Sequence, residues 1–254
     1  MLTKINSNKI NYEKYGNSKN TILILPGWGN TRETFNTMIE ELKENNTIYI
    51  IDYPGFGKSP ISKETLTIYD YANIIEKLIK KLKIKNPTII AHSFGGRLAS
   101  ILIGSKRINC NKLILIDVAG IRRFNLKRFL KEKLYKLLKK CTNLLSRKAK
   151  EKTQQKLFKH FSSSDYKELS PIMRKTFQNI IKEDLTKYYK SIKTETLIIW
   201  GELDEETPLK DGKKIHKIIK NSGLIIFPKA NHFPYLNYPI LFNKIIKEFT
   251  KKSS

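Results

Sequence analysis

The sequence contains few cysteines and no long apolar run. Its two cysteines, Cys110 and Cys141, have no metal-binding or redox spacing. So few cysteines, in a chain whose first residues contain no apolar signal segment, favour a reducing cytoplasm over a disulfide. No window approaches ~18 unbroken apolar residues, the length that a membrane-spanning helix needs. The sequence therefore predicts a cytoplasmic protein with neither a signal peptide nor a stable membrane insertion.

Acidic residues are also scarce. The chain has 23 Asp and Glu against 49 Lys and Arg, a formal net charge of +26. Such an excess can indicate an acidic partner such as nucleic acid, anionic lipid or an acidic protein. Lysines greatly outnumber arginines, however, whereas nucleic-acid readers also use arginine forks and aromatic platforms. We therefore favour compositional drift and expect no nucleic-acid partner. The excess is uneven, since residues 121–160 hold fifteen Lys or Arg against two Glu.

The 254 residues are 40% hydrophobic and 28% charged, a globular balance. Mostly continuous apolar runs predict parallel strands at 21–26, 47–52, 87–92, 111–117, 195–200 and 223–228. Helical spacing occurs at 32–44, 66–82, 94–106, 209–220 and 240–251. The alternating segment KINYEKYG, residues 9–16, predicts an antiparallel edge hairpin. This alternation predicts an α/β fold with a mostly parallel central sheet and helices on both faces.

A long segment without this alternation follows the predicted strand at 111–117. Within it, residues 124–145 are strongly amphipathic and residues 176–192 have helical spacing. Long excursions inside a compact fold are usually functional, and open α/β sheets bind ligands at their C-terminal edge. We therefore predict a basic helical cap at 121–190, inserted after the sixth strand. Residues 1–120 and 191–254 form the core domain.

Ser93 lies in the stretch AHSFGGR, between a predicted strand and a predicted helix. Small residues on both sides allow a tight turn, which lifts a hydroxyl above the sheet edge. The same turn points the first helical amide, that of Phe94, toward a developing oxyanion. A serine hydroxyl is a weak nucleophile, so this interpretation requires a base and an orienting acid elsewhere. Without them, Ser93 is a polar residue in a turn.

His232 is the best candidate for the base. It lies in KANHFPYLNYP, the loop after the last predicted strand, which emerges at the same sheet edge as Ser93. His92 is adjacent to Ser93 in sequence, but we expect it to point away from the hydroxyl. His160 and His216 lie in lysine-rich helical surroundings and are expected to be solvated.

Two carboxylates could orient His232. Asp204 lies in WGELDEETPL, after the strand at 195–200, and would fix the imidazole tautomer that leaves Nε2 free. Asp117 ends the strand at 111–117 and is the rival. We favour Asp204, although a helix N-terminal acidic cluster would also explain the neighbouring carboxylates.

A second oxyanion donor should follow an early strand. In LPGWGN, residues 25–30, the amide of Trp28 is free to donate, because proline removes only the amide of Pro26. An ordinary Pro-Gly turn is the alternative interpretation of this stretch.

Taken together, the motifs resemble the serine hydrolase branch of the α/β-hydrolase superfamily. LPGWGN resembles its oxyanion loop, DYPGFGKS (52–59) its strand-four turn and AHSFGG its nucleophile elbow. WGELDEETP resembles the acid loop and NHFPYLNYP the histidine loop. Pro26 replaces the usual histidine and Ala91 the usual glycine, both at positions where sterics matter rather than proton transfer.

The resemblance implies acyl-transfer hydrolysis without a metal or an organic cofactor. Ser93 would attack a carbonyl, His232 would move the proton, Asp204 would orient the imidazole, and Trp28 and Phe94 would bind the oxyanion. A serine rather than an aspartate at the elbow argues against the dehalogenase and epoxide-hydrolase branches. The expected reaction is hydrolysis of a carboxylic ester or thioester of a small to medium acyl substrate.

Several alternatives stay open. The chain resembles the esterases that cleave pimeloyl-acyl-carrier-protein methyl ester, which implies docking of an acidic carrier protein. That docking would use Arg122, Arg123, Lys127 and Arg128. Carbon–carbon bond hydrolysis, a lyase of the menaquinone-pathway kind and a non-catalytic binding protein are possible on the same fold. The segment 124–145 also matches a membrane-surface helix, although we expect it to cover the substrate pocket.

Overall fold

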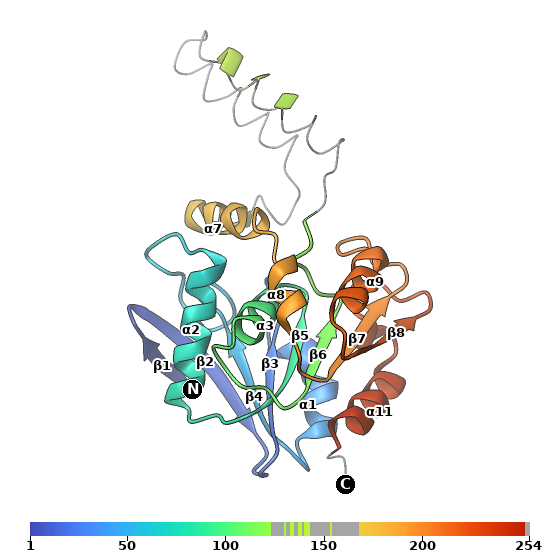
Figure 1. Ribbon diagram of the computed structural model, residues 1–254. Coiled ribbons are helices and arrows are strands. Elements are labelled where there is room, and N and C mark those ends of the chain that lie inside the picture. The colour runs from blue at the N-terminus through green and yellow to red at the C-terminus, as the bar shows by residue number, and fades with distance from the viewer. Residues whose placement is uncertain are drawn as a thin grey trace.

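The computed structural model describes residues 1–122, 130, 133–134, 137–138, 140–142, 153 and 168–251. In the described part of the chain, an eight-stranded sheet has the order β1-β2-β4-β3-β5-β6-β7-β8 (Figure 1). Its strands are β1 (Leu2–Ile5), β2 (Asn8–Tyr15), β3 (Thr21–Leu25), β4 (Thr47–Asp52), β5 (Thr88–His92), β6 (Leu113–Ile116), β7 (Thr196–Gly201) and β8 (Ser222–Phe227).

The sheet is parallel from β4 to β8, and β1 and β2 form an antiparallel hairpin at one edge. Central strands such as β6 are buried along their whole length, as expected for strands covered by helices on both faces. The edge strand β8 is partly exposed. The predicted mostly parallel sheet is confirmed. The segment 9–16 is not a hairpin by itself, because its residues 9–15 lie in the single strand β2, which pairs with β1 in the antiparallel hairpin.

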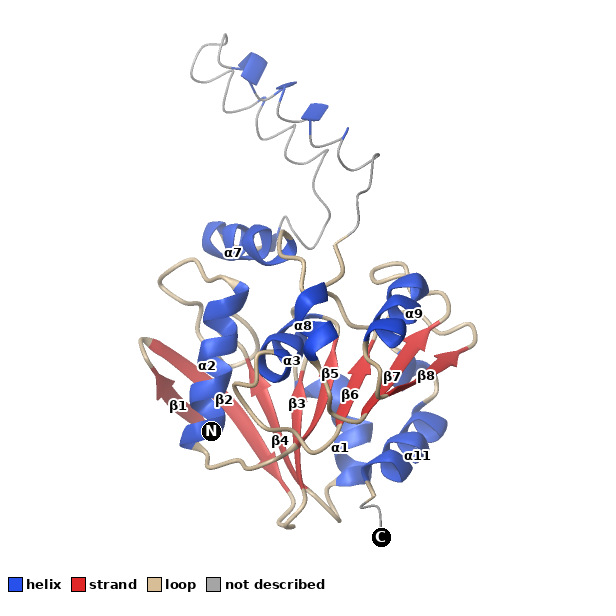
Figure 2. Ribbon diagram, in the orientation of Figure 1, coloured by secondary structure: helices blue, strands red, loops and turns tan. Residues whose placement is uncertain are grey.

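Helices form two layers, one on each face of the sheet (Figure 2). Their bounds are η1 (Arg32–Phe35), α1 (Asn36–Leu42), α2 (Ile68–Lys81), α3 (Phe94–Gly104), α7 (Pro171–Ile181), α8 (Thr186–Ser191), α9 (Leu209–Ile218), α10 (Pro234–Asn237) and α11 (Pro239–Thr250). Helices α2, α3, α8 and α9 bury apolar side chains such as Leu102 against one face. Helices α1, α10 and α11 bury side chains such as Phe242 against the other.

Two predicted helices are broken in the structure. The segment 32–44 begins as the 3-10 turn η1, in which the Thr34 hydroxyl donates to the carbonyl oxygen of Thr31, and becomes α-helical only in α1. The segment 176–192 is not one helix, because α7 ends and α8 starts anew. Between them, the Asp184 carboxylate accepts hydrogen bonds from the backbone N–H groups of Thr186 and Arg122, each at 2.9 Å. A side chain that bonds to nearby backbone offers the chain an alternative to the helix.

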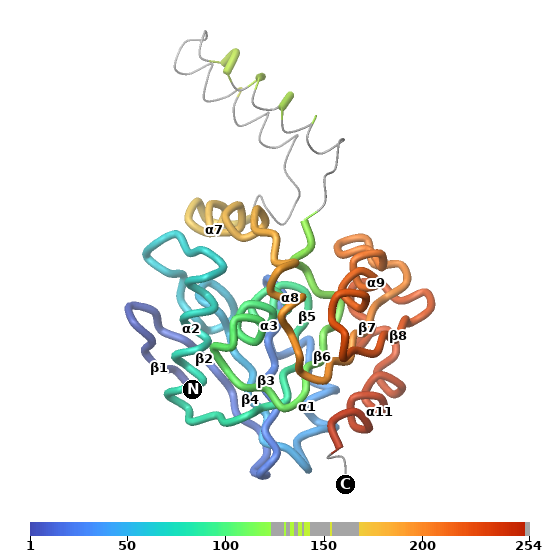
Figure 3. The backbone as a smooth tube through the Cα atoms, viewed as in Figure 1, coloured from blue at the N-terminus to red at the C-terminus, as the bar shows by residue number. Residues whose placement is uncertain are grey.

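Helix α7 lies over the edge at which the parallel strands end (Figure 3). Its Thr176 hydroxyl accepts a hydrogen bond from the backbone N–H of Leu66, and Met173 packs against Gly55 in the turn after β4. The predicted amphipathic helix 124–145 lies mostly outside the described residues, so the cap at 121–190 stays a prediction. None of the helices in the described ranges combines the length and apolarity needed to cross a membrane.

Candidate active site

Ser93 occupies a strained turn between β5 and α3. Its backbone has φ 48° and ψ −110°, a conformation that is rare for residues other than glycine. Three hydrogen bonds hold it there. Its N–H donates to the carbonyl oxygen of Ile116, and its own carbonyl oxygen accepts from the N–H groups of Gly96 and Ala119. The turn places Ser93, partly exposed, at the N-terminus of α3, as a nucleophile elbow requires.

The turn fits only because its neighbours are small. A Cβ on Gly95 would lie 2.0 Å from the carbonyl oxygen of Leu25, and one on Gly96 would lie 2.3 Å from the Cβ of Val118. Ala91 is fully buried in the middle of the sheet. The methyl group that replaces the usual glycine hydrogen at this position is therefore accommodated.

Substitution of Gly95 tests this packing. The added methyl group in Gly95→Ala would meet the backbone of β3, which cannot move without breaking the sheet, so we expect a loss of about 3 kcal/mol in the free energy of unfolding. For a chain of this size that lowers Tm by roughly 6–12 °C. The control is Gly223→Ala, whose Cβ would find its first neighbour at 4.0 Å. Equal melting temperatures for the two variants would contradict the packing argument.

His232 and Asp204 form a buried pair. The distance between His232 Nδ1 and Asp204 Oδ2 is 2.8 Å, and the two residues are 5% and 4% exposed. Asp204 Oδ1 accepts from the N–H groups of Glu206 and Thr207, at 2.8 and 2.9 Å, and the Thr207 hydroxyl lies 2.6 Å from Oδ2. Burial alone would raise the pKa of Asp204, but the hydrogen bond with His232, the neighbouring carboxyl group of Asp117 and the hydrogen bond with Thr207 outweigh burial and lower the pKa to about 2. The carboxylate is therefore ionised at neutral pH and fixes the imidazole orientation.

Asp117, the rival acid, lies beside this pair. Its Oδ1 accepts from the N–H of Gly201 at 2.9 Å, and the hydrogen bond to His232 comes from Asp204 instead. One nitrogen or oxygen atom from each of the side chains of Asp117, Asp204 and His232 lies within 4.8 Å of the other two. These residue types can ligate a metal ion, but Nδ1 and Oδ2 of the His232–Asp204 pair already bond to each other. The set therefore suits proton transfer better than metal binding.

His92 connects the histidine loop to the serine turn. Its Nε2 lies 2.9 Å from the backbone carbonyl oxygen of His232, and the two rings are 4.8 Å apart. Burial, followed by the charge of His232, lowers the pKa of His92 to about 3, so the ring is neutral and donates through Nε2–H. The sequence indicated only that His92 would not serve Ser93 as a base. Its contact with the loop 140 residues later was missed.

The His232 imidazole is held next to the residue that precedes Ser93. Within the described ranges, no hydrogen bond joins the Ser93 hydroxyl to His232, and Nε2 of His232 lies 3.4 Å from Glu206 Oε2. Hydrogen bonds between catalytic groups are often long without substrate and shorten in the complex. Ser93, Asp204 and His232 follow the parallel strands β5, β7 and β8 at one sheet edge, and the Asp204 carboxylate bonds to Nδ1 of His232 rather than to Nε2.

Trp28, in the loop after β3, lies beside Phe94, at the start of α3. Their rings meet edge to face with centroids 5.4 Å apart. Phe94 is the first residue of α3, so its N–H has no acceptor within the helix. A Cβ on Gly27 would come within 2.8 Å of His92 Nδ1, so only glycine allows the LPGWGN loop to pack this closely.

Aromatic side chains surround Trp28. Phe56 and Phe177 contact its ring edge to face, with centroids 4.7 and 5.2 Å away. Together with Phe94, they make an aromatic wall from the loop after β3, the turn after β4, the start of α3 and the helix α7. Phe56 and Phe177 could not be predicted from the sequence, because nothing in their spacing relates them to Trp28.

The turn DYPGFGKS presents Phe56 to this wall. Asp52 Oδ2 accepts from the backbone N–H of Lys58 at 2.9 Å, which closes the turn. Gly57 has φ 52°, and a Cβ on it would lie 2.4 Å from the Asp52 carboxyl group. The two motif residues, Asp52 and Gly57, are therefore structural, and they act on the site through Phe56.

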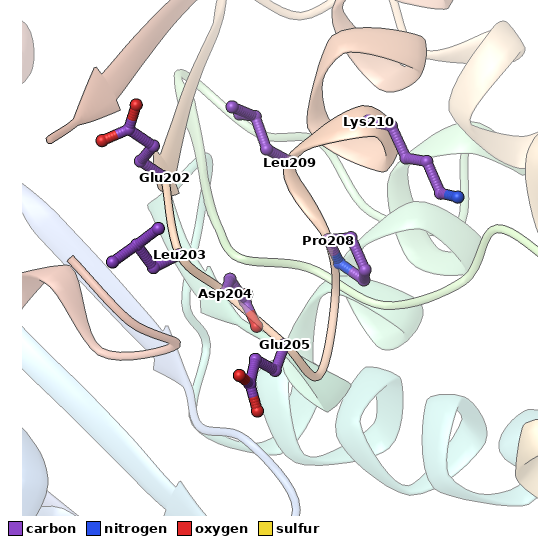
Figure 4. Close-up of a pocket in the computed structure, with 7 residues that line it drawn as sticks. All are labelled: Glu202, Leu203, Asp204, Glu205, Pro208, Leu209 and Lys210. Carbon is purple, nitrogen blue, oxygen red and sulfur yellow. The ribbon is translucent and has the colours of Figure 1, made fainter. Parts of the chain in front are cut away.

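An open pocket of about 500 Å³ lies on the acid loop (Figure 4). Its lining residues are Glu202, Leu203, Asp204, Glu205, Pro208, Leu209 and Lys210. The pocket shares only Asp204 with the histidine pair and includes no residue of the aromatic wall. The pocket is therefore formed by the acid loop and not by the aromatic wall.

The other predicted residues lie away from this site or outside the described ranges. His216 is exposed, with Nδ1 2.9 Å from the Ser222 hydroxyl oxygen. Arg122 is exposed, as a docking residue must be. Outside the described residues are His160, Arg123, Lys127 and Arg128.

Known proteins resemble this chain in sequence and in fold. A family model described as alpha/beta hydrolase fold matches residues 20–239. A pimeloyl-[acyl-carrier protein] methyl ester esterase of Wigglesworthia glossinidia brevipalpis is 31% identical over 93% of this chain and 96% of its own. A 2-hydroxy-6-oxononadienedioate/2-hydroxy-6-oxononatrienedioate hydrolase 1 of Pseudomonas putida is 26% identical over 94% and 91%. The solved structure of an esterase from Exiguobacterium antarcticum covers 99% of this chain and 98% of its own, with a TM-score of 0.77 and 23% identity.

Proposed function

Since the chain belongs to the α/β hydrolase fold family and is a hydrolase, we propose that it cleaves a carboxylic ester or thioester through Ser93, His232 and Asp204. The observation that carries the proposal is the 2.8 Å hydrogen bond between His232 and Asp204, at the same sheet edge as the strained turn of Ser93. Asp204 keeps the proton of the imidazole on Nδ1, so Nε2 can take the proton of the Ser93 hydroxyl.

The reaction then has two halves. The Ser93 oxygen attacks the substrate carbonyl carbon, and the amides of Trp28 and Phe94 donate to the oxyanion of the tetrahedral intermediate. One such donor contributes ~3 kcal/mol to lowering the barrier. The protonated His232 gives its proton to the leaving alcohol or thiol, which leaves an acyl group on Ser93. Water, deprotonated by His232, attacks the acyl-enzyme and releases the acid.

The aromatic wall supports an apolar acyl group as the substrate. Trp28 supplies the proposed oxyanion amide, and its ring contacts Phe56, Phe94 and Phe177. An acyl chain whose carbonyl oxygen meets the Trp28 amide would thus lie along these rings. The relative named as a pimeloyl-[acyl-carrier protein] methyl ester esterase favours a narrower version, in which the ester is attached to an acidic carrier protein.

Docking of a carrier protein on basic residues such as the exposed Arg122 must weaken as salt screens the charges. We expect kcat/KM for a carrier-bound ester to fall between about 0.05 and about 0.5 M salt, and kcat/KM for a small ester to change little. A carrier-bound ester that is hydrolysed equally well at both salt concentrations would rule out charge-based docking.

The test of ester hydrolysis is a panel of p-nitrophenyl esters of increasing acyl length, assayed together with fluorophosphonate labelling. We expect turnover of short and medium esters. Carbon–carbon bond hydrolysis is the alternative to ester hydrolysis, because one relative is named as a 2-hydroxy-6-oxononadienedioate/2-hydroxy-6-oxononatrienedioate hydrolase. Labelling of Ser93 without turnover of any ester would favour that alternative or a lyase.

Glu206 is expected to select the leaving group. Its carboxylate lies 3.4 Å from Nε2 of His232, the atom beside which the alcohol departs. An anionic alcohol would be repelled there, so Glu206→Gln should raise kcat/KM for acetylsalicylate about threefold, a modest factor because the side chain is exposed. Phenyl acetate, with a neutral leaving group, is the control substrate, and Glu205→Gln is the matched variant. An equal change for both esters would contradict this role.

A further inference from the structure

Asp117 forms hydrogen bonds with the acid loop. It is fully buried at the end of β6, with a positive φ of 43°, and its N–H donates to the carbonyl oxygen of Ile199. Its Oδ1 accepts from the N–H of Gly201, where the acid loop begins. Its backbone carbonyl oxygen lies 2.9 Å from the Thr207 hydroxyl, which is 2.6 Å from Asp204 Oδ2. Asp117 therefore contacts both ends of the loop that carries Asp204.

If Asp117 is ionised, its second carboxyl oxygen, Oδ2, is a buried acceptor without a hydrogen-bond donor among the described residues. A buried carboxylate oxygen without a donor is unfavourable, and the nearby Asp204 carboxylate would add repulsion between like charges. Asp204 has donors on both of its oxygens, so the single negative charge belongs on Asp204.

We propose that Asp117 is a neutral carboxylic acid whose Oδ2–H donates a hydrogen bond to Asp204, and that it is a positioning residue for the His232–Asp204 pair. A proton on Oδ2 turns the unsatisfied acceptor into a donor and removes the repulsion. The bond holds the Asp204 carboxylate in the rotation that directs Oδ2 at His232. The two residues that the sequence presented as rivals are thus partners that share one proton. The catalytic consequence rests on the proposed function, whereas the protonation does not.

The electrostatics of the site agree with this assignment. Burial, and after it the neighbouring Asp204 carboxylate, raise the pKa of Asp117 to about 9, although the hydrogen bond from the amide of Gly201 lowers it. The pKa of Asp204 is lowered to about 2. The other titratable groups that face Asp117 are Glu206 on the acid loop, His232 on its own loop and Tyr235 on α10. Between the two pKa values the carboxyl pair carries one negative charge.

Thermal unfolding against pH tests the protonation without any assay of activity. A carboxyl group whose pKa is raised in the folded state stabilises the fold below its unfolded pKa of 3.8 and loses that contribution as pH rises toward 9. The amide introduced by Asp117→Asn keeps the shape of the carboxyl group, the acceptor for Gly201 and a donor for Asp204, but it cannot ionise. We expect Tm of the variant relative to native protein to rise steadily from about pH 4 to about pH 9. A difference that does not change with pH would overturn the proposal.

Labelling of the aspartate carboxyl carbons with ¹³C gives a second test that needs no folded variant. One resonance of the native protein should keep the shift of a neutral acid at about pH 7 and move only as the pH approaches about 9. If every aspartate titrates below about pH 5, within the ordinary range of the residue, Asp117 is ionised and the proposal is wrong.

The positioning role is tested by kinetics on a p-nitrophenyl ester. Asp117→Ala removes the donor to Asp204, so we expect kcat at about pH 7.5 to fall at least about tenfold with KM within about threefold of native. Asp117→Asn should rescue kcat to within about threefold, and should lack the native change in rate near pH 9. Equal activity of Asp117→Ala and native enzyme would overturn the role, as would a loss in Asp117→Asn as large as in Asp117→Ala. Native protein that hydrolyses no ester would instead count against the proposed function, and the unfolding test would still decide the protonation.

Discussion

Ser93→Ala is expected to lower kcat for p-nitrophenyl esters by at least ~10³-fold and by as much as ~10⁶-fold. The substitution removes the only atom that forms a bond with the substrate in the proposed mechanism. What remains is the binding of the transition state by the oxyanion amides, so some activity above that of water should persist. Ser93→Ala and His232→Ala together should be scarcely worse than either alone, since both disable the same step.

The loss must be separated from misfolding. Ser93 has a positive φ, and alanine tolerates that conformation poorly, so a small fall in Tm is expected. Ser100→Ala is a suitable control, because Ser100 lies about two turns further along α3, where its hydroxyl donates to the carbonyl oxygen of Arg97. A folded Ser93→Ala protein with kcat within about tenfold of native would show that another group is the nucleophile.

Asp204→Asn is expected to lower kcat by ~10⁴-fold, while KM and the fold are little changed. The amide has the shape of the carboxylate, but its NH₂ group cannot accept from Nδ1–H of His232. The imidazole then places its proton on Nε2, which faces the substrate, and cannot act as a base. Asp204 is buried and accepts hydrogen bonds on both of its oxygens. Water therefore has little access to replace the hydrogen bonds that the substitution removes.

Asp184→Asn, which alters the carboxylate between α7 and α8, controls for a general effect of removing a negative charge. The comparison with Asp117→Asn identifies the orienting acid. If Asp204→Asn retained activity and Asp117→Asn lost ~10⁴-fold, Asp117 would be the orienting acid and the proposed arrangement would be wrong.

The sheet could be predicted because its strands are buried on both faces. Runs such as TILILP and NKLILID are apolar without alternation, as expected of buried parallel strands, and their short length and β-branched isoleucines favour a strand over a buried helix. The helix 176–192 was predicted wrongly because helical spacing persists through residues 182–185. The break arises from the hydrogen bonds of Asp184 with Thr186 and Arg122, and the second of these joins residues 62 positions apart.

Part of the candidate site could likewise be predicted from the sequence, and part could not. The placement of Ser93, Asp204 and His232 at one sheet edge could be predicted, because each follows a strand and the C-terminal ends of parallel strands share one edge. His92, Phe56 and Phe177 were missed because their contacts to His232 and Trp28 depend on how whole loops pack. Asp117 and Asp204 were both recognised as acids at that edge. Their relation could not be predicted, since it depends on burial and on which oxygen has a donor.

The central claim is that Ser93 is the nucleophile. Its most direct test is intact mass spectrometry of the native protein after reaction with a fluorophosphonate, followed by peptide mapping. We expect one phosphonyl group per chain, on Ser93, with labelling abolished in Ser93→Ala and slowed in His232→Ala. A native protein that stays unlabelled, or that carries the label on another residue, would contradict the proposed mechanism.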